Sequence, residues 1–166
     1  MATIEDLKAA MSAKAPARPD RYRVRIPGLN AVGDILCQAT NLPGRQITTT
    51  ERRIGMVTQK MPYGFIFDDV SLTFLLDNEY VIKNYFEDWH EDIIGFDTYE
   101  LKYKNDYSKT VEIQQLDKET ESVVYGVRLK NAFPVTISPI ELGDGLQNQI
   151  TQVNVQLAFT DWERTT

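Results

Sequence analysis

The sequence is short of the residues from which many enzymes and metal proteins build their sites. Its 166 residues include one cysteine, Cys37, and one histidine, His90. A single cysteine excludes an intramolecular disulfide, and this pair alone cannot supply the usual zinc sites made of several Cys and His. A phosphate-binding loop, a dinucleotide-binding glycine motif and a nucleophile elbow are also missing. We therefore expect no metal, no cofactor and no catalytic residue.

Long apolar runs are missing as well. No stretch approaches the roughly 18 consecutive apolar residues of a membrane span, and the first thirty residues lack the apolar core of a secretory signal. The composition, 42% hydrophobic and 25% charged, is that of a globular protein that buries a core. The length fits one domain with an arm or tail. We expect no membrane span.

The charges are divided unevenly along the chain. Residues 1–62 carry ten Lys and Arg against five Asp and Glu, whereas residues 63–166 carry eight against nineteen, within a formal net charge of −6. Complementary surfaces orient association, so this division favours a protein that docks onto its own copies. The alternative interpretation is that both groups of charges are simply solvated.

Alternation of apolar and polar residues predicts a mainly β protein. In Tyr22–Ile26 the apolar residues alternate with arginines, which is the period of a strand with one buried and one basic face. Further strands are expected at Asp34–Ala39, Val70–Leu76, Tyr99–Tyr103, Thr110–Leu116, Ser122–Leu129 and Gln149–Thr160. Phe133-Pro134 is expected to mark a break.

One amphipathic helix is expected over residues 78–94, with Asn78 capping its start and Gly95 its end. The apolar residues that recur there at helical spacing are Ile82, Phe86, Trp89 and Ile93. Acidic residues occupy the other side. Such a helix covers one face of a sheet.

A long hairpin is expected over residues 45–60, after the Leu42-Pro43-Gly44 turn. The segment is rich in β-branched residues and poor in large apolar ones, and Gly55 can supply its turn. Because an isolated two-stranded ribbon is only marginally stable in water, we expect the hairpin to lie against another surface, such as a second subunit.

Residues 1–19 are expected to form an N-terminal arm ahead of a single domain of residues 20–166. Thr3 is a candidate helix cap with Asp6 three residues later, and Pro16 and Pro19 stop that helix from continuing. The remaining pattern predicts two packed antiparallel sheets, as a β-sandwich or barrel, with one flanking α-helix and the long extended hairpin.

Two other functions rest on weaker patterns. His90 neighbours carboxylates in Trp89-His90-Glu91-Asp92, but it falls at the edge of an apolar stripe without a second ligand, so we interpret it as a boundary residue rather than a catalytic one. A ligand-binding β-sandwich that stays monomeric would display aromatic residues as a platform. The candidates are Tyr63, Phe65, Tyr99 and Tyr103, which are more simply core or interface residues.

Nucleic-acid binding is a further alternative, because a basic β-ribbon can enter a groove of a duplex. The basic residues concerned are Arg21, Arg23, Arg25, Arg45, Arg52, Arg53 and Lys60. Nineteen acidic residues in the rest of the chain oppose the neutralisation of phosphates on which such binding depends. We therefore expect no specific DNA binding.

Several motifs, taken in order along the chain, resemble the tail tube proteins of contractile-tailed bacteriophages. They are Ala17-Arg18-Pro19 before Tyr22–Ile26, Cys37–Gly44, Phe67-Asp68-Asp69 with Ser71–Phe74, Asp77-Asn78-Glu79, Phe86-Glu87-Asp88-Trp89, Phe133-Pro134, and Gln149–Thr160 with Asp161-Trp162-Glu163. The resemblance covers most of the chain, and its specificity lies in the order of the motifs rather than in any one of them.

The resemblance implies a structural, non-enzymatic protein. Its subunits would form hexameric rings that stack into a hollow tube, and DNA would pass through the lumen without sequence-specific binding. The implied partners are the tail sheath, baseplate and tail terminator proteins, and the implied location is the virion tail, with the host cytoplasm during assembly. A tube protein of a related contractile injection or secretion system is the alternative within the same fold.

The resemblance also assigns roles to residues. The hairpin Arg45–Lys60 and the C-terminal end would make contacts between subunits and rings. The expected contact residues are Arg45, Thr48, Thr50, Arg52, Arg53, Ile54, Met56, Lys60 and Trp162. A DNA conduit should not hold DNA, which favours a lumen of acids and amides. The candidates are Glu112, Gln114, Gln152, Asn154 and Gln156, for which a face in open solvent is the alternative.

Overall fold

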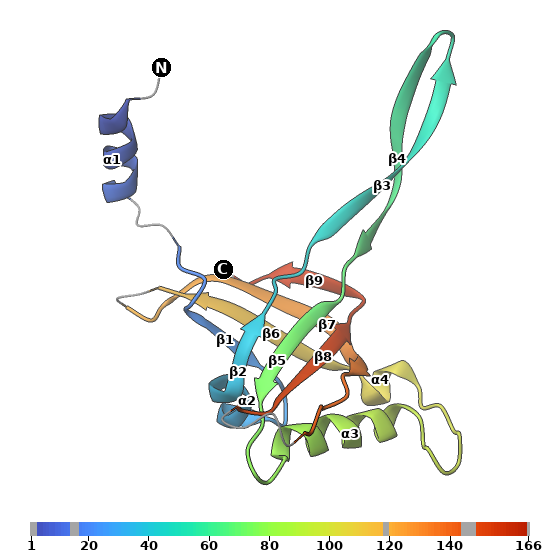
Figure 1. Cartoon of the computed structure of the whole chain (residues 1–166). Helices are drawn as coiled ribbons and strands as arrows, with labels where there is room; N and C mark the ends of the chain where they lie inside the picture. Colours follow the sequence, from blue (N-terminus) through green and yellow to red (C-terminus); the bar gives the residue numbers. More distant parts are fainter. Residues whose placement is uncertain (1–2, 14–16, 118–119, 144–148, 166) are drawn as a thin grey trace.

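The computed structural model describes residues 3–13, 17–117, 120–143 and 149–165. Two antiparallel sheets share one long strand, β7 (Val123–Ile137), as Figure 1 shows. The first sheet consists of β1 (Tyr22–Arg25), β6 (Lys109–Leu116), residues 123–132 of β7 and β9 (Asp161–Arg164). The second sheet consists of residues 133–137 of β7, β8 (Gln152–Ala158), β5 (Val70–Leu75) and β2 (Cys37–Thr40). The predicted mainly β sandwich is confirmed.

Strand β7 changes partners at the place where a break was expected. Its residues up to Ala132 pair with β6, whereas Phe133 and Pro134 already pair with β8, and the register shifts between Pro134 and Thr136. Proline has no N–H to give to a ladder and is tolerated at such irregular positions. The strand therefore passes from one sheet to the other without ending.

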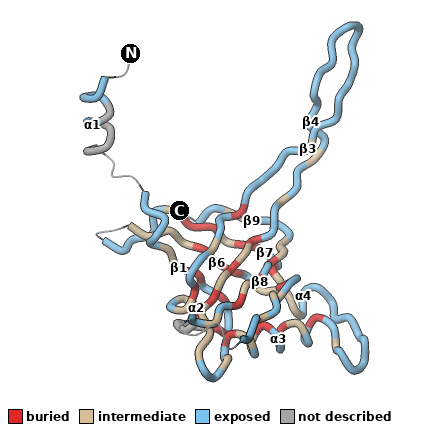
Figure 2. The backbone as a smooth tube through the Cα atoms, viewed as in Figure 1, coloured by how far each residue is buried: buried red, intermediate tan, exposed pale blue. Residues whose placement is uncertain are grey.

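The core lies between the two sheets and beneath helix α3 (Val81–Ile93), which covers one end of the sandwich (Figures 1 and 2). Side chains alternate along β8, so that Val153, Val155 and Leu157 are buried, as the period of two predicts. The four predicted apolar residues of α3 are also buried: Ile82, Phe86, Trp89 and Ile93. The predicted apolar side chains of the helix and of the strand therefore pack in one core.

The predicted caps of this helix were wrong. Tyr80, with a φ of 54°, precedes the first turn, and the N–H of Val81 donates to the carboxylate of Asp77 at 3.2 Å, so Asn78 is not the cap. At the other end Ile94 leaves the helix in an extended conformation, one residue before Gly95. The start of the helix is therefore set by the Asp77 side chain and by the left-handed backbone conformation of Tyr80, and the composition of the segment does not indicate either.

The first half of the strand expected at Asp34–Ala39 is helix. Helix α2 (Asn30–Leu36) includes Asp34, and the second half of the predicted segment lies in β2. The reason is local: Asp34 accepts the N–H of Val24 at 3.1 Å and pairs with Arg23 at 3.0 Å, which holds this turn against β1.

The strand expected at Tyr99–Tyr103 is absent. A single bridge joins Ile94 and Leu101, and helix α4 (Lys104–Tyr107) follows. Tyr99 has a φ of 55°, and both Tyr99 and Tyr103 are more than four-fifths exposed, so the alternating pattern has no core to face.

The hairpin extends further than predicted. It consists of β3 (Arg45–Ile54) and β4 (Val57–Phe67), and it projects from the sandwich in Figure 1. Helix α1 (Ile4–Ala13) begins at the predicted cap, where the N–H of Asp6 donates to the Thr3 hydroxyl at 3.2 Å. Across the described ranges, the helices are too short or too polar to cross a membrane.

Candidate assembly interface

The hairpin is a two-stranded ribbon without a core of its own. From Arg45 to Phe67 every side chain is exposed or half-buried, and Figure 2 shows the ribbon exposed along most of its length. Gly55, with a φ of 65°, makes the turn, and the neighbouring Met56 is 97% exposed. Glycine tolerates that conformation without strain. The tip therefore presents a large apolar side chain to its surroundings.

The two faces of the outer hairpin differ in chemistry. Cross-strand partners share a face, and the pairs Ile54 with Val57 and Thr50 with Met61 place three large apolar side chains on one face, where the pair Arg52 with Gln59 lies between them. We call Ile54, Val57 and Met61 the apolar hairpin face. The opposite face carries the partners Glu51 and Lys60, and Arg53. Ile54 was among the contact residues predicted from the sequence, but Val57 and Met61 were not. These two lie four residues apart in β4, and residues an even number apart in a strand share a face, so the spacing could have indicated them.

A register shift separates the outer hairpin from its base. Thr48 pairs with Gly64, whereas Thr49 pairs with Pro62, so Tyr63 is the extra residue in β4. Such a bulge increases the local twist. The outer hairpin is therefore turned relative to the base.

Two predicted contact residues, Arg45 and Trp162, meet within this one chain. The Arg45 guanidinium lies 5.0 Å from the ring centre of Trp162, and it also lies over the rings of Phe65 and Phe67. We call these four residues the Arg45 cluster. Trp162 is half-buried, so its predicted contact with another subunit stays a prediction.

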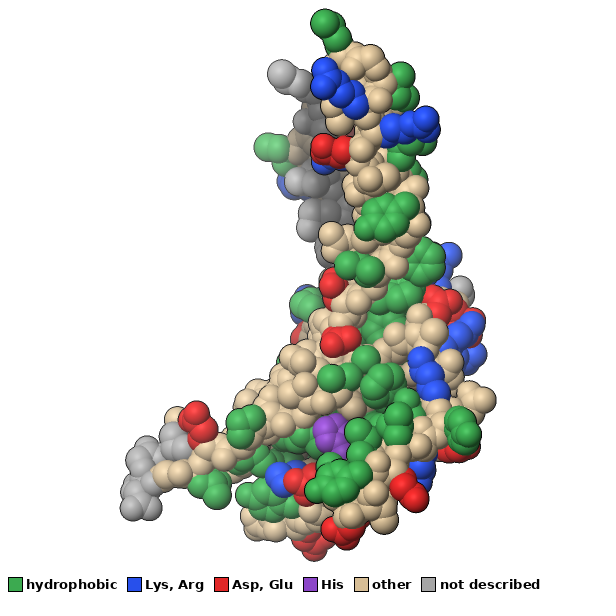
Figure 3. Space-filling model, turned by 90° about the vertical axis from the view of Figure 1, so that its right-hand side faces the viewer, with side chains coloured by type: hydrophobic (Ala, Val, Ile, Leu, Met, Phe, Trp, Pro, Cys, Tyr) green, Lys and Arg blue, Asp and Glu red, His purple; other side chains and the backbone are tan. Residues whose placement is uncertain are grey.

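Charge is separated along the molecule. In Figure 3 basic side chains lie near the hairpin tip together with an acidic one, and several acidic side chains gather at the opposite end beside a few basic ones. Arg52 and Arg53 flank the tip, while the exposed residues of α3 include Glu87, Asp88 and Glu91. The hairpin tip and helix α3 therefore differ in charge, although Arg23 and Arg25 of β1 and Arg45 at the hairpin base lie away from the tip.

The outer face of the first sheet carries an ion-pair network. Arg128 lies 2.9 Å from Glu112 and 3.3 Å from Glu163, and Lys130 lies 2.6 Å from Glu163. Gln114 donates to Glu112 at 3.3 Å. Glu112 and Gln114 are therefore part of a charged surface.

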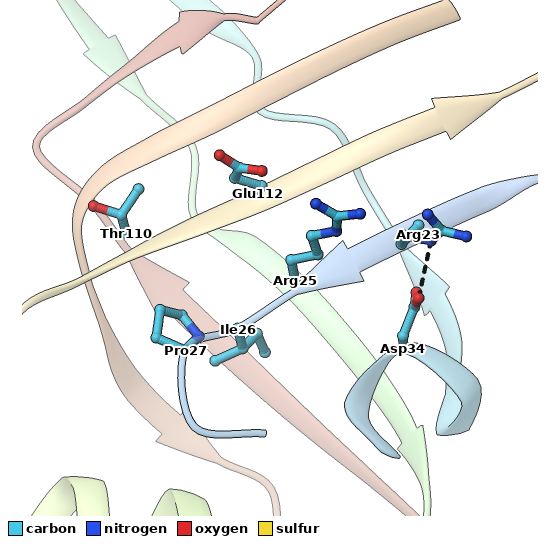
Figure 4. Close-up of a pocket in the computed structure, with 7 residues that line it drawn as sticks. All are labelled: Arg23, Arg25, Ile26, Pro27, Asp34, Thr110 and Glu112. Carbon is cyan, nitrogen blue, oxygen red and sulfur yellow. Dashed lines mark ion pairs between the residues drawn. The ribbon is translucent and has the colours of Figure 1, made fainter. Parts of the chain in front are cut away.

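A hollow of about 600 Å³ adjoins this network. Figure 4 shows Arg23 turned towards Asp34, while Arg25 lies between them and Glu112. Glu112 pairs with Arg128, and Arg25 forms no ion pair with any residue in the described part of the chain. This face therefore has a cation available for an acidic group.

The outer face of the second sheet is uncharged. None of the residues in β2, β5, β8 and residues 133–137 of β7 is Asp, Glu, Lys or Arg. Asn154 donates to Ser71 at 2.9 Å and to Thr73 at 3.1 Å, and Gln152 donates to Gln38 at 2.6 Å. The inner faces of both sheets share one core, so this surface points away from Glu112 and Gln114.

The residues proposed for other functions do not assemble into a site. Tyr63 and Phe65 lie on the hairpin, whereas Tyr99 and Tyr103 lie in the segment after α3, and all four are exposed rather than core residues.

Burial lowers the pKa of half-buried His90. Within the described ranges, no three Cys, His, Asp or Glu side chains are arranged to hold a metal ion.

Residues 17–165 match the family model for phage tail tube proteins. The chain belongs to this family. It is a structural subunit of a tail tube, as the resemblance implied. Tail tube protein gp19 of Enterobacteria phage T6 and its counterpart in phage T4 are each 24% identical to it over 172 residues, which span 96% of this chain and 99% of each relative.

Solved structures of contractile assemblies share the fold. A chain in the extended sheath–tube complex of an extracellular contractile injection system, PVC, aligns with a TM-score of 0.71 and 16% identity over 95% of this chain and 97% of its own. A chain in the baseplate of the anti-feeding prophage aligns with a TM-score of 0.68 and 17% identity, covering 92% and 97%. The sandwich with a projecting hairpin is thus a fold found in contractile machines.

Proposed function

We propose that this tail tube protein forms hexameric rings that stack into a hollow tube through which phage DNA is ejected, and that it acts without catalysis. The observation that carries the proposal is the hairpin, which has no buried residue in the single chain although it displays a face of apolar side chains. Such a ribbon gains stability by lying on another subunit. Head-to-tail contacts between copies give rings when the rotation closes and filaments when it does not.

The hairpin supplies contacts of two kinds in this proposal. The apolar side chains of the hairpin face pack on the neighbouring subunit, while Arg52 beside them and Arg53 on the opposite face approach the acidic end of a copy in the next ring. The predicted contact residues Thr48, Thr50 and Met56 lie along the same ribbon. Opposite charges orient the approaching copies, and apolar burial then holds them.

The N-terminal arm, residues 1–19, joins these contacts. Its helix α1 stands away from the sheets in Figure 1 and spans ten residues, which is too short for a helix to be stable alone in water. We expect a neighbouring subunit to supply the surface on which it rests.

The uncharged outer face of the second sheet lines the lumen in this proposal. Gln152, Asn154 and Gln156 offer amides and no cation, so DNA passes without releasing counterions. Glu112 and Gln114 belong to the other face, where Arg25 would hold phosphates. The five lumen candidates therefore separate into two sets, of which we favour the one on β8.

The partners follow from the same assembly. The related folds come from a sheath–tube complex, a baseplate, and structures described as a sheath/tube terminator and a tube-terminating cap. We infer that this chain meets sheath, baseplate and terminator proteins in the virion tail and assembles in the host cytoplasm. The related injection systems supply the alternative of a DNA-free tube, but the relatives that are 24% identical to this chain are tail tube proteins of phages.

A charge reversal at the tip tests the assembly. The double variant Arg52→Glu, Arg53→Glu is expected to remain folded and soluble, because both side chains are exposed, and to fail to extend tubes. Negative-stain microscopy over a concentration series, beside the wild type, gives the result. Normal tubes from the variant would remove the tip from the contacts, and a wild type that stays monomeric at every concentration would contradict the proposed tube.

Labelling tests the lumen. Cysteine is introduced at Gln156 or at Gln114, and assembled tubes are treated with a small maleimide and with one carrying a long polymer. A lumen position should react with the small reagent and resist the large one, whereas an outer position reacts with both. Resistance at Gln114 and reaction at Gln156 would reverse the assignment of the two faces.

A further inference from the structure

Arg45 stands where the hairpin leaves the sandwich. It is the first residue of β3, and its cross-strand partner Phe67 is the last residue of β4. Its guanidinium lies 5.0 Å from the Trp162 ring centre, 5.3 Å from that of Phe67 and 5.6 Å from that of Phe65. These distances are within the range in which an arginine is attracted to an aromatic face. One cation therefore joins both strands of the hairpin to a third strand, β9.

An aromatic row connects this point to the core. The ring centres of Phe65 and Phe67 are 5.4 Å apart, and those of Phe67 and Phe159 are 5.5 Å apart. Phe159 packs against the buried core. The base of the hairpin is thus tied to the sandwich although the rest of the ribbon is exposed.

Strand β9 gives the cluster a fixed wall. Trp162 pairs with Leu129 of β7, and the neighbouring Glu163 is held by Arg128 and Lys130. Arg45 also lies 3.7 Å from Asp161, in an ion pair that is about half exposed. Exposed ion pairs of this kind contribute little, so the rings are the main partners of the guanidinium.

The backbone hydrogen bonds of the hairpin do not attach it to the sandwich. In the described part of the chain, β3 and β4 pair with one another and with no third strand. A ribbon held in this way can swing about its base. Its direction is therefore determined by the contacts at that base.

We propose that Arg45 is a positioning residue that sets the direction in which the hairpin leaves the sandwich, by stacking between the hairpin aromatics and Trp162 of the C-terminal strand. The direction is present in the free subunit, before a second copy binds. A hairpin already aimed at its target loses less conformational freedom on assembly.

The test measures the direction of the hairpin in the free, full-length subunit. Spin labels are attached to cysteines introduced at the tip, Met56→Cys, and on an exposed site of α3, Asp88→Cys. Native Cys37 is buried, and burial raises the pKa of its thiol to about 12, so it takes no label. Pulsed electron paramagnetic resonance then gives the distribution of tip-to-helix distances.

The wild type is expected to give one narrow distribution and Arg45→Ala a broad one, with an unchanged melting temperature because Arg45 is about half exposed. Hydrogen exchange at the hairpin base should accelerate about fivefold in Arg45→Ala. Arg45→Lys, which keeps the charge without the planar group, should lie between the two. Arg52→Ala, a matched removal of an arginine from the tip, should match the wild type.

Two more variants separate the contact with the aromatic rings from the ion pair with Asp161. Phe65→Ser removes an exposed ring and leaves the sandwich untouched, and it should broaden the distribution as well. Asp161→Asn removes only the ion pair and should leave the distribution narrow. The proposal is overturned if Arg45→Ala and Phe65→Ser keep the wild-type distribution, or if Asp161→Asn broadens it as much as Arg45→Ala. Because no tubes are needed, this outcome is independent of the proposed function.

Discussion

The apolar hairpin face should control how readily tubes grow. The double variant Ile54→Thr, Val57→Thr replaces two β-branched apolar side chains by a β-branched polar one, so the strands keep their propensity. In the single chain Ile54 is 54% exposed and Val57 is 60% exposed, so more than half of each side chain is available for burial by a neighbour. Burying a whole side chain of this kind is worth about 1.5–3 kcal/mol, which leaves about 1 kcal/mol for each.

The double variant therefore loses about 2 kcal/mol for every subunit added to a tube, which corresponds to a roughly 30-fold higher subunit concentration at the onset of assembly. Pelleting and negative-stain microscopy across a dilution series measure that onset. Ile47→Thr is the control, because Ile47 is 61% exposed but belongs to the face opposite the apolar one. An onset for the double variant equal to that of the wild type, with folded protein in both, would refute the assignment of this face to a subunit contact.

Three further predictions concern the sandwich. Trp89→Phe should lower the free energy of unfolding by about 2–3 kcal/mol in urea, because the indole N–H donates to the carbonyl oxygen of Tyr107 at 2.7 Å and the smaller ring leaves a void. Cys37 should resist thiol reagents at pH 8 in the folded protein and react once guanidinium unfolds it, because its thiol is buried with a pKa of about 12. Burial lowers the pKa of His90 below 6.5, so the unfolded chain takes up the proton first and stability should fall as the pH drops below about 6.5; thermal melting of His90→Gln should show a weaker fall.

The sandwich could be predicted from the sequence where local pattern and burial agree. Along β8 the alternation of apolar and amide residues matches the buried and outer faces, and the helical spacing of Phe86 and Trp89 matches the buried side of α3. Both patterns reflect contacts that each element must make to bury apolar surface. The segment Tyr99–Tyr103 alternates equally well, but it has no partner strand and no core beneath it. Alternation in the sequence does not by itself provide a partner strand or a core.

The candidate interface was predictable as a segment and not as a set of faces. Composition showed that the hairpin lacks a core, whereas the bulge near Thr49 and the cross-strand register determine which residues share a face. The pairing of Arg45 with Trp162 joins residues far apart in the sequence, and nothing local to either one indicates it. Likewise, Glu112 and Gln156 are similar polar residues of two strands, and only the order of the strands places them on opposite surfaces.

The absence of charge from the outer face of the second sheet determines how that surface responds to the salt concentration and pH around the particle. Amide and hydroxyl side chains neither titrate between acidic and alkaline pH nor attract a shell of counterions. The surface formed by Ser71, Thr73, Gln152, Asn154 and Gln156 therefore offers the same electrostatic environment in fresh water, in brine and in acid. The charged face of the first sheet, in contrast, changes with each of these media.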